Sequence, residues 1–331
     1  MKIVITGGLG FIGLNLARAI IERGTLTGPS GNQEEVDSIL LFDQFVPDSL
    51  PEGLDRRVTM QAGDISDRDT VFGLMDRDDI SVFHLASVVS GGGEKDFDLA
   101  MRVNLDGGRH VFEAARVRNS LPRVVFASSV AVFGGSAMPK VVGDTTKQTP
   151  QTTYGMTKAI GELMVNDYTR KGFFDGRSVR LPTIFIRPGK PNAAASSFCS
   201  GVFREPLAGE ECILPVKTDV KMALLGYRNA VAGFIGLHEA DGDAIGDDRA
   251  VVLPSVTYTV QEMIDGVKRV AAANKIELGP ITVRPDPVIE KIVAGWATHS
   301  EAPRAEALGL PNDESLDRVI QDFIDDFMPG R

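Results

Sequence analysis

Short apolar runs alternate with amphipathic stretches along the first 190 residues of the chain. The apolar runs are rich in Val, Ile, Leu and Phe, which is typical of buried strands. The stretches between them carry apolar residues at a spacing near 3.6, which is typical of helices. We predict strands at residues 2–6, 39–43, 57–64, 81–87, 123–129 and within 178–189, and helices at 10–24, near 67–77, near 96–119 and from Tyr154 onward. Strands that alternate with helices in this way predict βαβ units, and therefore an α/β fold with a doubly wound parallel sheet.

The alternation ends at Gly189, and the second half of the chain is smaller and less regular. We predict a helix near 228–240, strands at 250–254 and 281–285, a helix within 257–273 that Thr259 and Glu262 begin with capping-box spacing, and helical structure over the last 40 residues. The chain is therefore expected to form two domains. The larger spans residues 1–189, and a smaller mixed α/β region spans residues 190–331, with some interleaving between the two.

A glycine-rich turn, TGGLGFIG, joins the first predicted strand to the first helix. Gly7, Gly10 and Gly13 have GxxGxxG spacing, a variant of the dinucleotide-binding fingerprint. The early glycines allow a tight turn and let a pyrophosphate approach the backbone, and the last lets the helix pack close to the strand. Free N–H groups of the first helical turn, at Phe11 and Ile12, would face the phosphates. The turn predicts a Rossmann-type domain, against the alternative of a turn without a ligand.

Asp43 ends the second predicted strand, after a polar loop over residues 27–38. A carboxylate at this position can accept hydrogen bonds from the adenosine ribose and would repel a 2′-phosphate. Asp43 therefore predicts NAD rather than NADP as the cofactor. The alternative is a solvated aspartate at the end of a strand.

Tyr154 and Lys158 stand four residues apart in PQTTYGMTKAIGE, so they share one face of a helix. Such a pair also occurs by chance on surface helices, so other features have to decide. Ser128 and Ser129 end the fifth predicted strand, at the edge where open parallel sheets bind ligands. A nearby ammonium group and a positive nicotinamide ring both favour a phenolate, so Tyr154 can act as a base near neutral pH. A serine, a tyrosine and a lysine at this edge predict an alcohol dehydrogenation.

Eight features of the chain occur in the order found in the extended short-chain dehydrogenase/reductases, which the chain resembles over roughly residues 1–190. They are TGGLGFIG, Asp43, the Gly-Asp pair at 63–64, HLAS at 84–87, Asn104, SSVAVFG, YGMTK and RPG at 187–189. The resemblance implies a catalytic group of Ser129, Tyr154 and Lys158, with Ser128 as the weaker candidate for the serine. The cofactor residues that it implies are Asp64 and Ile65 at the adenine, Ala86, Ser87 and Pro188 along the cleft, Lys158 at the nicotinamide ribose, and Asn104, which would support Lys158 through water.

Residues 180–210, together with HLASVVSGG and VNDYTRKGFFDGR, resemble a subgroup of this family that oxidises D-erythronate. This resemblance implies a small sugar acid that is oxidised at its C2 hydroxyl to a 2-oxo acid, with NAD as the oxidant. A small anion needs a positive partner, and arginine can grip a carboxylate with two hydrogen bonds. The candidates for substrate binding are Arg228, Arg204 and Lys190 for the carboxylate and Asn192 and Ser90 for hydroxyl groups. The alternative is that these arginines are ordinary surface charges.

Two other functions remain open on the same fold. The first is a nucleotide-sugar epimerase or dehydratase, although Phe133 replaces the tyrosine of SSxAVYG and GYRNAV stands where those enzymes carry VDD. The second is a binding protein that senses NAD without catalysis. Such proteins can lose the tyrosine–lysine pair, which this chain retains.

Composition limits the partners and the compartment. The net charge of −10 disfavours nucleic acid, and two cysteines in 331 residues indicate a reducing compartment. The sequence shows neither a cleavable signal segment nor an apolar run of about 18 residues. The four histidines are scattered and neither cysteine lies near one in the sequence. We therefore expect a cytoplasmic protein without a metal site, a membrane span or a nucleic-acid partner.

Apolar residues on two helices predict a homodimer, because related proteins pair two such helices in a four-helix bundle. These residues are Ala159, Ile160, Leu163 and Met164 on the helix from Tyr154, and Leu99, Val103, Val111, Phe112 and Ala115 on the helix near 96–119. The alternative is that they pack only on their own sheet.

Overall fold

The structure is a computed structural model that describes residues 1–191 and 194–328. The strands, in chain order, are β1 (Lys2–Thr6), β2 (Thr25–Thr27), β3 (Gln33–Glu35), β4 (Ser38–Asp43), β5 (Val58–Ala62), β6 (Ile80–His84), β7 (Arg123–Ser129), β8 (Val141–Val142), β9 (Asp175–Leu181), β10 (Thr183–Phe185), β11 (Cys212–Leu214), β12 (Lys221–Gly226), β13 (Ala250–Val252), β14 (Val256–Thr259), β15 (Ile281–Val283) and β16 (His299–Ser300). The helices are α1 (Phe11–Arg23), α2 (Arg68–Leu74), α3 (Ser90–Lys95), α4 (Phe97–Ala100), the π-helix η1 (Met101–Gly107), α5 (Gly108–Arg116), the 3₁₀ helix η2 (Val130–Val132), α6 (Thr153–Arg170), the 3₁₀ helix η3 (Ala195–Ser197), α7 (Phe198–Leu207), α8 (Tyr227–Glu239), α9 (Gly242–Ile245), α10 (Val260–Ala273), α11 (Pro287–Val293), α12 (Pro303–Ala307) and α13 (Leu316–Phe327).

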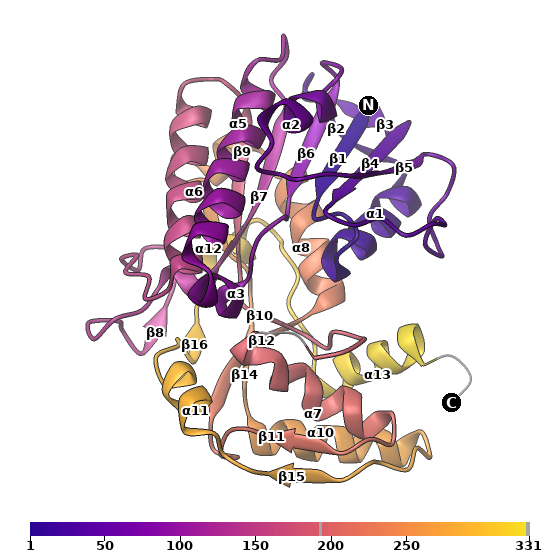
Figure 1. The fold of residues 1–331 in the computed structure, drawn as a ribbon, viewed down its shortest axis with the longest axis vertical. Helices are drawn as coiled ribbons and strands as arrows, with labels where there is room; N and C mark the ends of the chain where they lie inside the picture. Colours follow the sequence, from indigo (N-terminus) through magenta and orange to yellow (C-terminus); the bar gives the residue numbers. More distant parts are fainter. Residues whose placement is uncertain (192–193, 329–331) are drawn as a thin grey trace.

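A seven-stranded parallel sheet forms the centre of the larger part of the molecule (Figure 1). Its strand order is β13-β9-β7-β6-β1-β4-β5, and every neighbouring pair is parallel. The chain builds outward from β1 to β4 and β5, then returns to the other side of β1 with β6 and continues to β13. The predicted doubly wound sheet is confirmed. Its order reverses beside β1, which is where such folds bind ligands.

The two faces of this sheet pack on different helices, as the alternation of side chains along β1 shows. Ile3 and Ile5 enter the core that includes residues of α1 and α8, whereas Val4 points into the core formed with α2, α5 and α6. The period of two in a strand requires this division. Because both faces are covered, the strands read as continuous apolar runs, which is why the sequence predicted them well.

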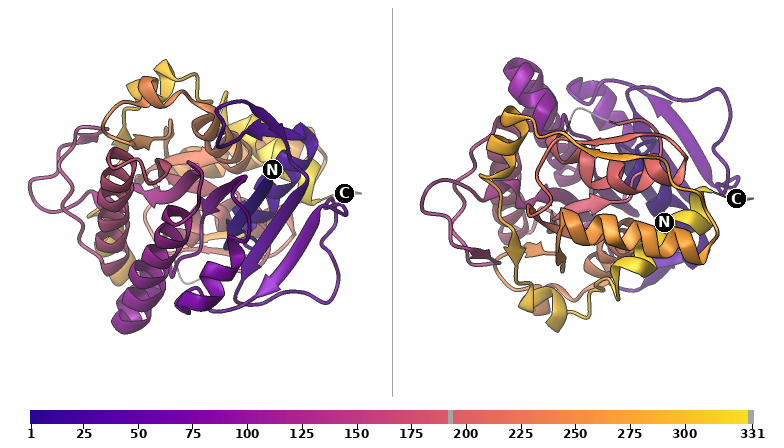
Figure 2. Two further views of the ribbon diagram at one scale, coloured as in Figure 1. Left: turned by 90° about the horizontal axis from the view of Figure 1, so that it is seen from above. Right: turned by 90° about the horizontal axis from the view of Figure 1, so that it is seen from below.

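A third core lies in the smaller part of the molecule, in the lower half of Figure 1. It is built around the sheet β10-β12-β14, the pair β11-β15 and helices α7, α10 and α13, which Figure 2 shows from below. Helix α10 begins with the capping box expected from the sequence, since Thr259 accepts from the backbone N–H of Glu262 and the Glu262 carboxylate accepts from that of Thr259. This cap fixes where β14 ends and α10 begins.

Segments beyond Gly189 also return to the large sheet. Helix α8 packs on α1 and on β9, and β13 pairs with β9. Strand β16 pairs with β8 in a separate two-stranded sheet. The second half of the chain therefore supplies both the separate third core and one edge of the first sheet.

The residue range 27–38, predicted to be a loop, holds most of a small antiparallel hairpin of β2 and β3. Its anchor is distant in sequence: the Glu239 carboxylate at the end of α8 accepts the backbone N–H of Thr27 at 2.9 Å and the amide of Gln33 at 2.6 Å. The helix predicted near 96–119 is likewise divided into α4, the π-helix η1 and α5. Both differences come from contacts that local sequence patterns do not encode.

Candidate active site

The glycine-rich turn after β1 packs backbone against backbone. Gly7 has a φ of 68°, and a Cβ added there would lie 2.8 Å from the amide nitrogen of Ala86. A Cβ on Gly13 would lie 2.5 Å from the carbonyl oxygen of Gly7. Gly10 caps α1 without a side chain, so the N–H groups of the first turn of α1, at Phe11, Ile12 and beyond, have no side-chain acceptor from the cap. This cradle fits a pyrophosphate group.

A cavity of about 340 Å³ extends from this turn along the ends of the strands. Of the residues predicted to bind the cofactor, Gly7, Gly10, Asp43, Asp64, Ile65, Ala86 and Ser87 line it, and Leu99 and Val103 add apolar surface. The structure thus brings together predicted residues from the carboxyl ends of four strands, β1, β4, β5 and β6. Its glycine floor, apolar walls and carboxylate fit a dinucleotide.

Besides lining the cavity, the Asp43 carboxylate makes backbone hydrogen bonds that the sequence did not suggest. One carboxylate oxygen accepts the N–H of Leu9 in the glycine turn at 3.1 Å, and the other accepts the N–H of Gln44 at 2.8 Å. Asp64 instead accepts both the N–H and the hydroxyl of Ser66, which lowers the pKa of its carboxyl group. Asp43 therefore helps to hold the shape of the turn besides facing the cavity.

Tyr154 is brought to the end of β7 by the first turn of α6. Thr152 caps this helix by accepting the N–H of Gly155 at 3.0 Å. A Cβ on Gly155 would lie 2.1 Å from the carbonyl oxygen of Ala131, so only glycine lets α6 approach the turn after β7 this closely. The side chain of Ser129 is close enough to Tyr154 as a result to affect the pKa of its phenol. The proposed base and the proposed serine therefore lie together.

Burial raises the pKa of Tyr154, and the nearby Ser129 hydroxyl acts in the opposite direction. This differs from the expectation of a phenolate favoured by its surroundings, because removal from water disfavours the charged form. Burial also lowers the pKa of the neighbouring Lys158 to about 7, while Glu162 acts to raise it. Burial thus disfavours both the phenolate form of Tyr154 and the ammonium form of Lys158 when either group is charged alone.

Ser128 points elsewhere, since its buried hydroxyl donates to the Glu162 carboxylate. Ser129, in contrast, is partly exposed, and its oxygen accepts the N–H of Ala131 at 3.1 Å. This arrangement favours Ser129 as the serine that meets the substrate.

Asn104 lies within the π-helix η1, a conformation that is frequent at functional sites. Its side chain accepts the N–H of Val88 at 2.7 Å and donates to the carbonyl of Val88 at 3.0 Å. It also donates to the hydroxyl of Thr157, beside Lys158, at 3.3 Å. Asn104 therefore ties the segment after β6 to the catalytic helix.

The residues predicted to bind the substrate are dispersed. Ser90 begins α3 and is partly buried, and Asn192 lies outside the described residues. Lys190 and Arg204 line a pocket of about 570 Å³ next to α13, together with Pro188, which was predicted to line the cofactor cleft. Arg204 is buried, donates to the carbonyl of Arg187 at 2.8 Å and pairs with the neighbouring Glu205.

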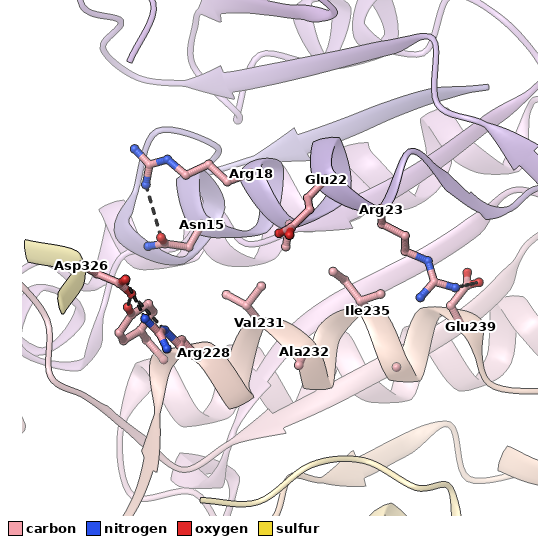
Figure 3. A pocket seen from close by; sticks show the side chains of 13 residues that line it. Asn15, Arg18, Glu22, Arg23, Arg228, Val231, Ala232, Ile235, Glu239 and Asp326 are labelled. Carbon is pink, nitrogen blue, oxygen red and sulfur yellow. Dashed lines mark hydrogen bonds and ion pairs between the residues drawn. The ribbon is translucent and has the colours of Figure 1, made fainter. Parts of the chain in front are cut away.

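Arg228, the first choice for the substrate carboxylate, lies in a different pocket of about 660 Å³ between α1 and α8. Figure 3 shows its guanidinium group beside Asp326, and it also pairs with Asp322 at 2.7 Å. Two carboxylates thus compensate its charge, and the structure does not bring it together with Tyr154 and Ser129. These partners are almost 100 residues away in the sequence, where no local pattern could reveal them.

Two features of the site were missed in the sequence. Gly155 directly follows Tyr154, and its steric role could have been suspected from the Tyr-Gly pair. The second is the buried ion pair of Glu162 with Arg180, whose partners lie on α6 and β9. Its only local signal is that Glu162 follows Lys158 by one helical turn.

Among the residues that the structure describes, no group of three or more His, Cys, Asp or Glu side chains could hold a metal ion. In the same part of the chain, none of the helices is long and apolar enough to cross a membrane.

Residues 3–247 of the chain match the NAD dependent epimerase/dehydratase family. The chain is 46% identical over 326 residues to a D-erythronate dehydrogenase of Cupriavidus necator, with 98% of each chain covered. It is 38% identical to a D-erythronate dehydrogenase of Haemophilus influenzae, with 98% of this chain and 99% of that one covered. Among solved structures, a nucleoside-diphosphate-sugar epimerase from Agrobacterium tumefaciens superposes with a TM-score of 0.90 at 39% identity, covering 100% of this chain and 95% of that one. The match over most of the chain confirms the resemblance drawn from its motifs, and the chain belongs to the NAD dependent epimerase/dehydratase family.

Proposed function

We propose that the protein oxidises the C2 hydroxyl of a small sugar acid, with D-erythronate as the substrate and NAD as the oxidant. The observation that carries this proposal is the short separation of the Ser129 and Tyr154 side chains. Tyr154 precedes Lys158 by one helical turn, and a cavity that fits a dinucleotide lies at the same edge of the sheet. The similarity over almost the full chain to two D-erythronate dehydrogenases supports the choice of substrate.

In this reaction, Ser129 and Tyr154 would hydrogen-bond the C2 hydroxyl, and Tyr154 would take up its proton as the carbonyl forms. A bound nicotinamide supplies the acceptor for the hydride that leaves C2. Burial opposes a charge on Tyr154 or on Lys158 alone. A phenolate beside an ammonium group is neutral overall, so each group stabilises the charged form of the other.

The preference for NAD over NADP rests on Asp43. Its carboxylate borders the cavity at the position where an adenosine ribose would lie. A 2′-phosphate there would meet a negative charge that the glycine turn holds in place through Leu9.

For the substrate carboxylate, Arg204 and its neighbour Arg187 are the better candidates, because Arg228 pairs with two carboxylates, whereas Arg204 pairs with one, Glu205. Desolvation and the positive charge of Arg204 lower the pKa of Arg187. Its guanidinium donates to the backbone carbonyl of Lys190. An added anion beside Arg187 would offset the effect of the neighbouring positive charge of Arg204.

A second candidate function is an epimerase acting on a nucleotide sugar. The observation in its favour is the likeness to the Agrobacterium structure, which is described as a nucleoside-diphosphate-sugar epimerase. An epimerase returns the hydride to its substrate, so it would retain its cofactor and release no NADH. A protein that only senses NAD is less favoured, because Ser129, Tyr154 and Lys158 are together at one site.

The test is a panel of four-carbon and longer aldonic acids with NAD, followed by NADH absorbance, beside an epimerisation assay with UDP-sugars. We expect NADH formation to be fastest with D-erythronate, and little or no conversion of UDP-sugars. Epimerisation of a UDP-sugar with tightly held NAD, and no turnover of aldonic acids, would refute the proposed function.

We also place the reaction in the cytoplasm. Cys199 and Cys212 are both free thiols, which supports a reducing compartment.

A further inference from the structure

Lys158 is a buried cation with no counterion in contact. Within residues 1–191 and 194–328 it forms no hydrogen bond or ion pair, although its side chain is only 3% exposed. Its Nζ atom lies 4.8 Å from the ring centre of Phe126 and 5.5 Å from that of Tyr154. A buried ammonium group ordinarily acquires a carboxylate partner.

A carboxylate for this purpose stands one helical turn further along α6. Glu162 follows Lys158 by four residues, a spacing at which opposite charges commonly pair. It is 2% exposed and acts to raise the pKa of Lys158, but the two groups form no ion pair.

The Glu162 carboxylate instead forms an ion pair with Arg180 on β9. Its Nε donates to Oε1 at 3.0 Å and to Oε2 at 3.1 Å, and Nη2 donates to Oε2 at 2.8 Å. The side chains of Ser128 and Gln148 donate to the same carboxylate. Its oxygens are therefore held by four side-chain donors, none of which belongs to Lys158.

Arg180 is itself fixed from other directions. Its Nη1 donates to the carbonyl of Asp144 at 3.0 Å, and its guanidinium lies 5.4 Å from the ring centre of Phe133. The carboxylate of Asp144 in turn accepts the N–H of Val252 on β13 at 2.9 Å. A guanidinium group held in this way donates two parallel hydrogen bonds to a carboxylate, a geometry that a lysine cannot reproduce.

We propose that Arg180 and Glu162 are positioning residues, in which Arg180 holds the Glu162 carboxylate away from Lys158 so that its ammonium group stays free for Tyr154 and the ribose. The inference rests on the proposed function only for that last role. The arrangement explains why a carboxylate one turn from a buried lysine does not neutralise it.

The other groups that face Lys158 do not supply a competing negative charge. His84 on β6 is buried, and desolvation together with the charge of Lys158 lowers its pKa to about 3, so it is neutral at physiological pH. Tyr154 on α6 and Asn104 on η1 are uncharged in this state. Of the carboxylates in the described chain, only Glu162 affects the pKa of Lys158.

The test is the titration of Lys158 in the full chain, measured by NMR of lysine labelled with carbon-13 at the ε position. Its signal is identified by its loss in Lys158→Met. The informative variant is Arg180→Lys, which keeps the positive charge but lacks the guanidinium group that holds both oxygens of the Glu162 carboxylate. We expect the midpoint to rise above its wild-type value by about 1 to 3 pH units, because the released carboxylate can then pair with Lys158.

Two further variants separate pairing from a general disturbance. Arg180→Lys combined with Glu162→Gln removes the carboxylate, so the midpoint should return to the wild-type value or fall below it. Arg249→Lys changes another buried arginine, which pairs with Asp175 at 2.7 Å, and should leave the midpoint unchanged. If Arg180→Lys does not fold, Ser128→Ala loosens the same carboxylate and should give a smaller rise.

An unchanged or lower midpoint in Arg180→Lys, or in Ser128→Ala if that variant has to be used, would overturn the proposal. So would a rise that persists in the double variant, because it would not depend on Glu162. The titration needs no substrate, so its outcome is independent of whether D-erythronate is turned over. Lack of turnover in the wild-type protein would count against the proposed function alone.

Discussion

Tyr154 is the residue on which the proposed chemistry depends most directly. We expect Tyr154→Phe to lower turnover by about 10²- to 10⁴-fold, the usual contribution of a positioned acid or base. The dissociation constant for NAD should change little, since the ring and its packing remain. Steady-state kinetics and calorimetric titration with NAD measure the two effects.

Tyr168→Phe is a matched control on the same helix. The hydroxyl of Tyr168 donates to Glu113, away from Ser129 and Lys158. Its removal should leave turnover within about twofold of wild type, since this partly buried hydrogen bond contributes only modestly to stability and lies away from the proposed site. A Tyr154→Phe variant as active as this control would show that the base lies elsewhere.

Asp43 is predicted to determine the preference for NAD over NADP. Asp43→Asn removes the charge but keeps an oxygen for the N–H of Leu9, whereas alanine would also release the glycine turn. We expect the ratio of kcat/KM for NAD to that for NADP to fall by about tenfold or more, since a hydrogen bond to a charged group contributes about 1.5–3 kcal/mol. A wild-type enzyme that prefers NADP would contradict the role given to Asp43.

Residue identities were predictable where the constraint is local. Gly7, Gly13, Tyr154 and Lys158 follow from spacing, because a tight turn and a helix face are short-range features. The surroundings of Arg228 were not predictable, since Asp322 and Asp326 approach it from the other end of the chain. Likewise, burial sets the direction of the Tyr154 pKa, and burial is a property of the folded molecule.

At the scale of elements, the turn between β1 and α1 leaves no room for a side chain at Gly13. In Gly13→Ala, the added methyl group would lie 2.5 Å from the Gly7 carbonyl oxygen and 2.7 Å from the Cα of Gly8. Backbone must shift, so we expect a loss of about 1–3 kcal/mol in stability and weaker NAD binding. Thermal unfolding with and without NAD measures both.

Gly73→Ala is the control for that prediction. Gly73 lies in α2, and a Cβ there meets nothing within 4 Å. Alanine should be neutral or stabilise the protein by up to about 1 kcal/mol, because glycine is a poor helix former. Equal effects of the two substitutions would mean that the turn is not sterically constrained.

The strands and most helices of the large sheet were predictable because their apolar periods are long and regular. The π-helix η1 and the hairpin of β2 and β3 were not. The hairpin depends on Glu239, more than 200 residues away, and η1 contains Asn104, whose contacts reach Val88 and Thr157. Elements that tertiary contacts hold in place leave little trace in local periodicity.

At the scale of the whole molecule, we predict a homodimer through α6 and the helical segment near 96–119, which consists of α4, η1 and α5. All three α5 residues proposed for this contact, Val111, Phe112 and Ala115, are buried in the core on their own side of the sheet. Leu163 on α6 is 63% exposed and is the strongest remaining candidate. Its side chain is therefore available to a partner helix.

Leu163→Glu should therefore shift the protein towards monomer in light scattering at micromolar concentration. Val288→Glu provides the control, since Val288 is 66% exposed on α11, in the smaller part of the molecule. It should leave the mass unchanged. A wild-type protein that is monomeric under these conditions would refute the predicted dimer.

The central claim is that this site removes a hydride from C2 of D-erythronate and releases it as NADH. The most direct measurement uses D-erythronate with deuterium at C2 and the mass of the NADH formed. We predict NADH that carries one deuterium, together with a 2-oxo acid that has lost it. NADH without deuterium would show oxidation at another carbon, and the absence of any NADH would contradict the dehydrogenase itself.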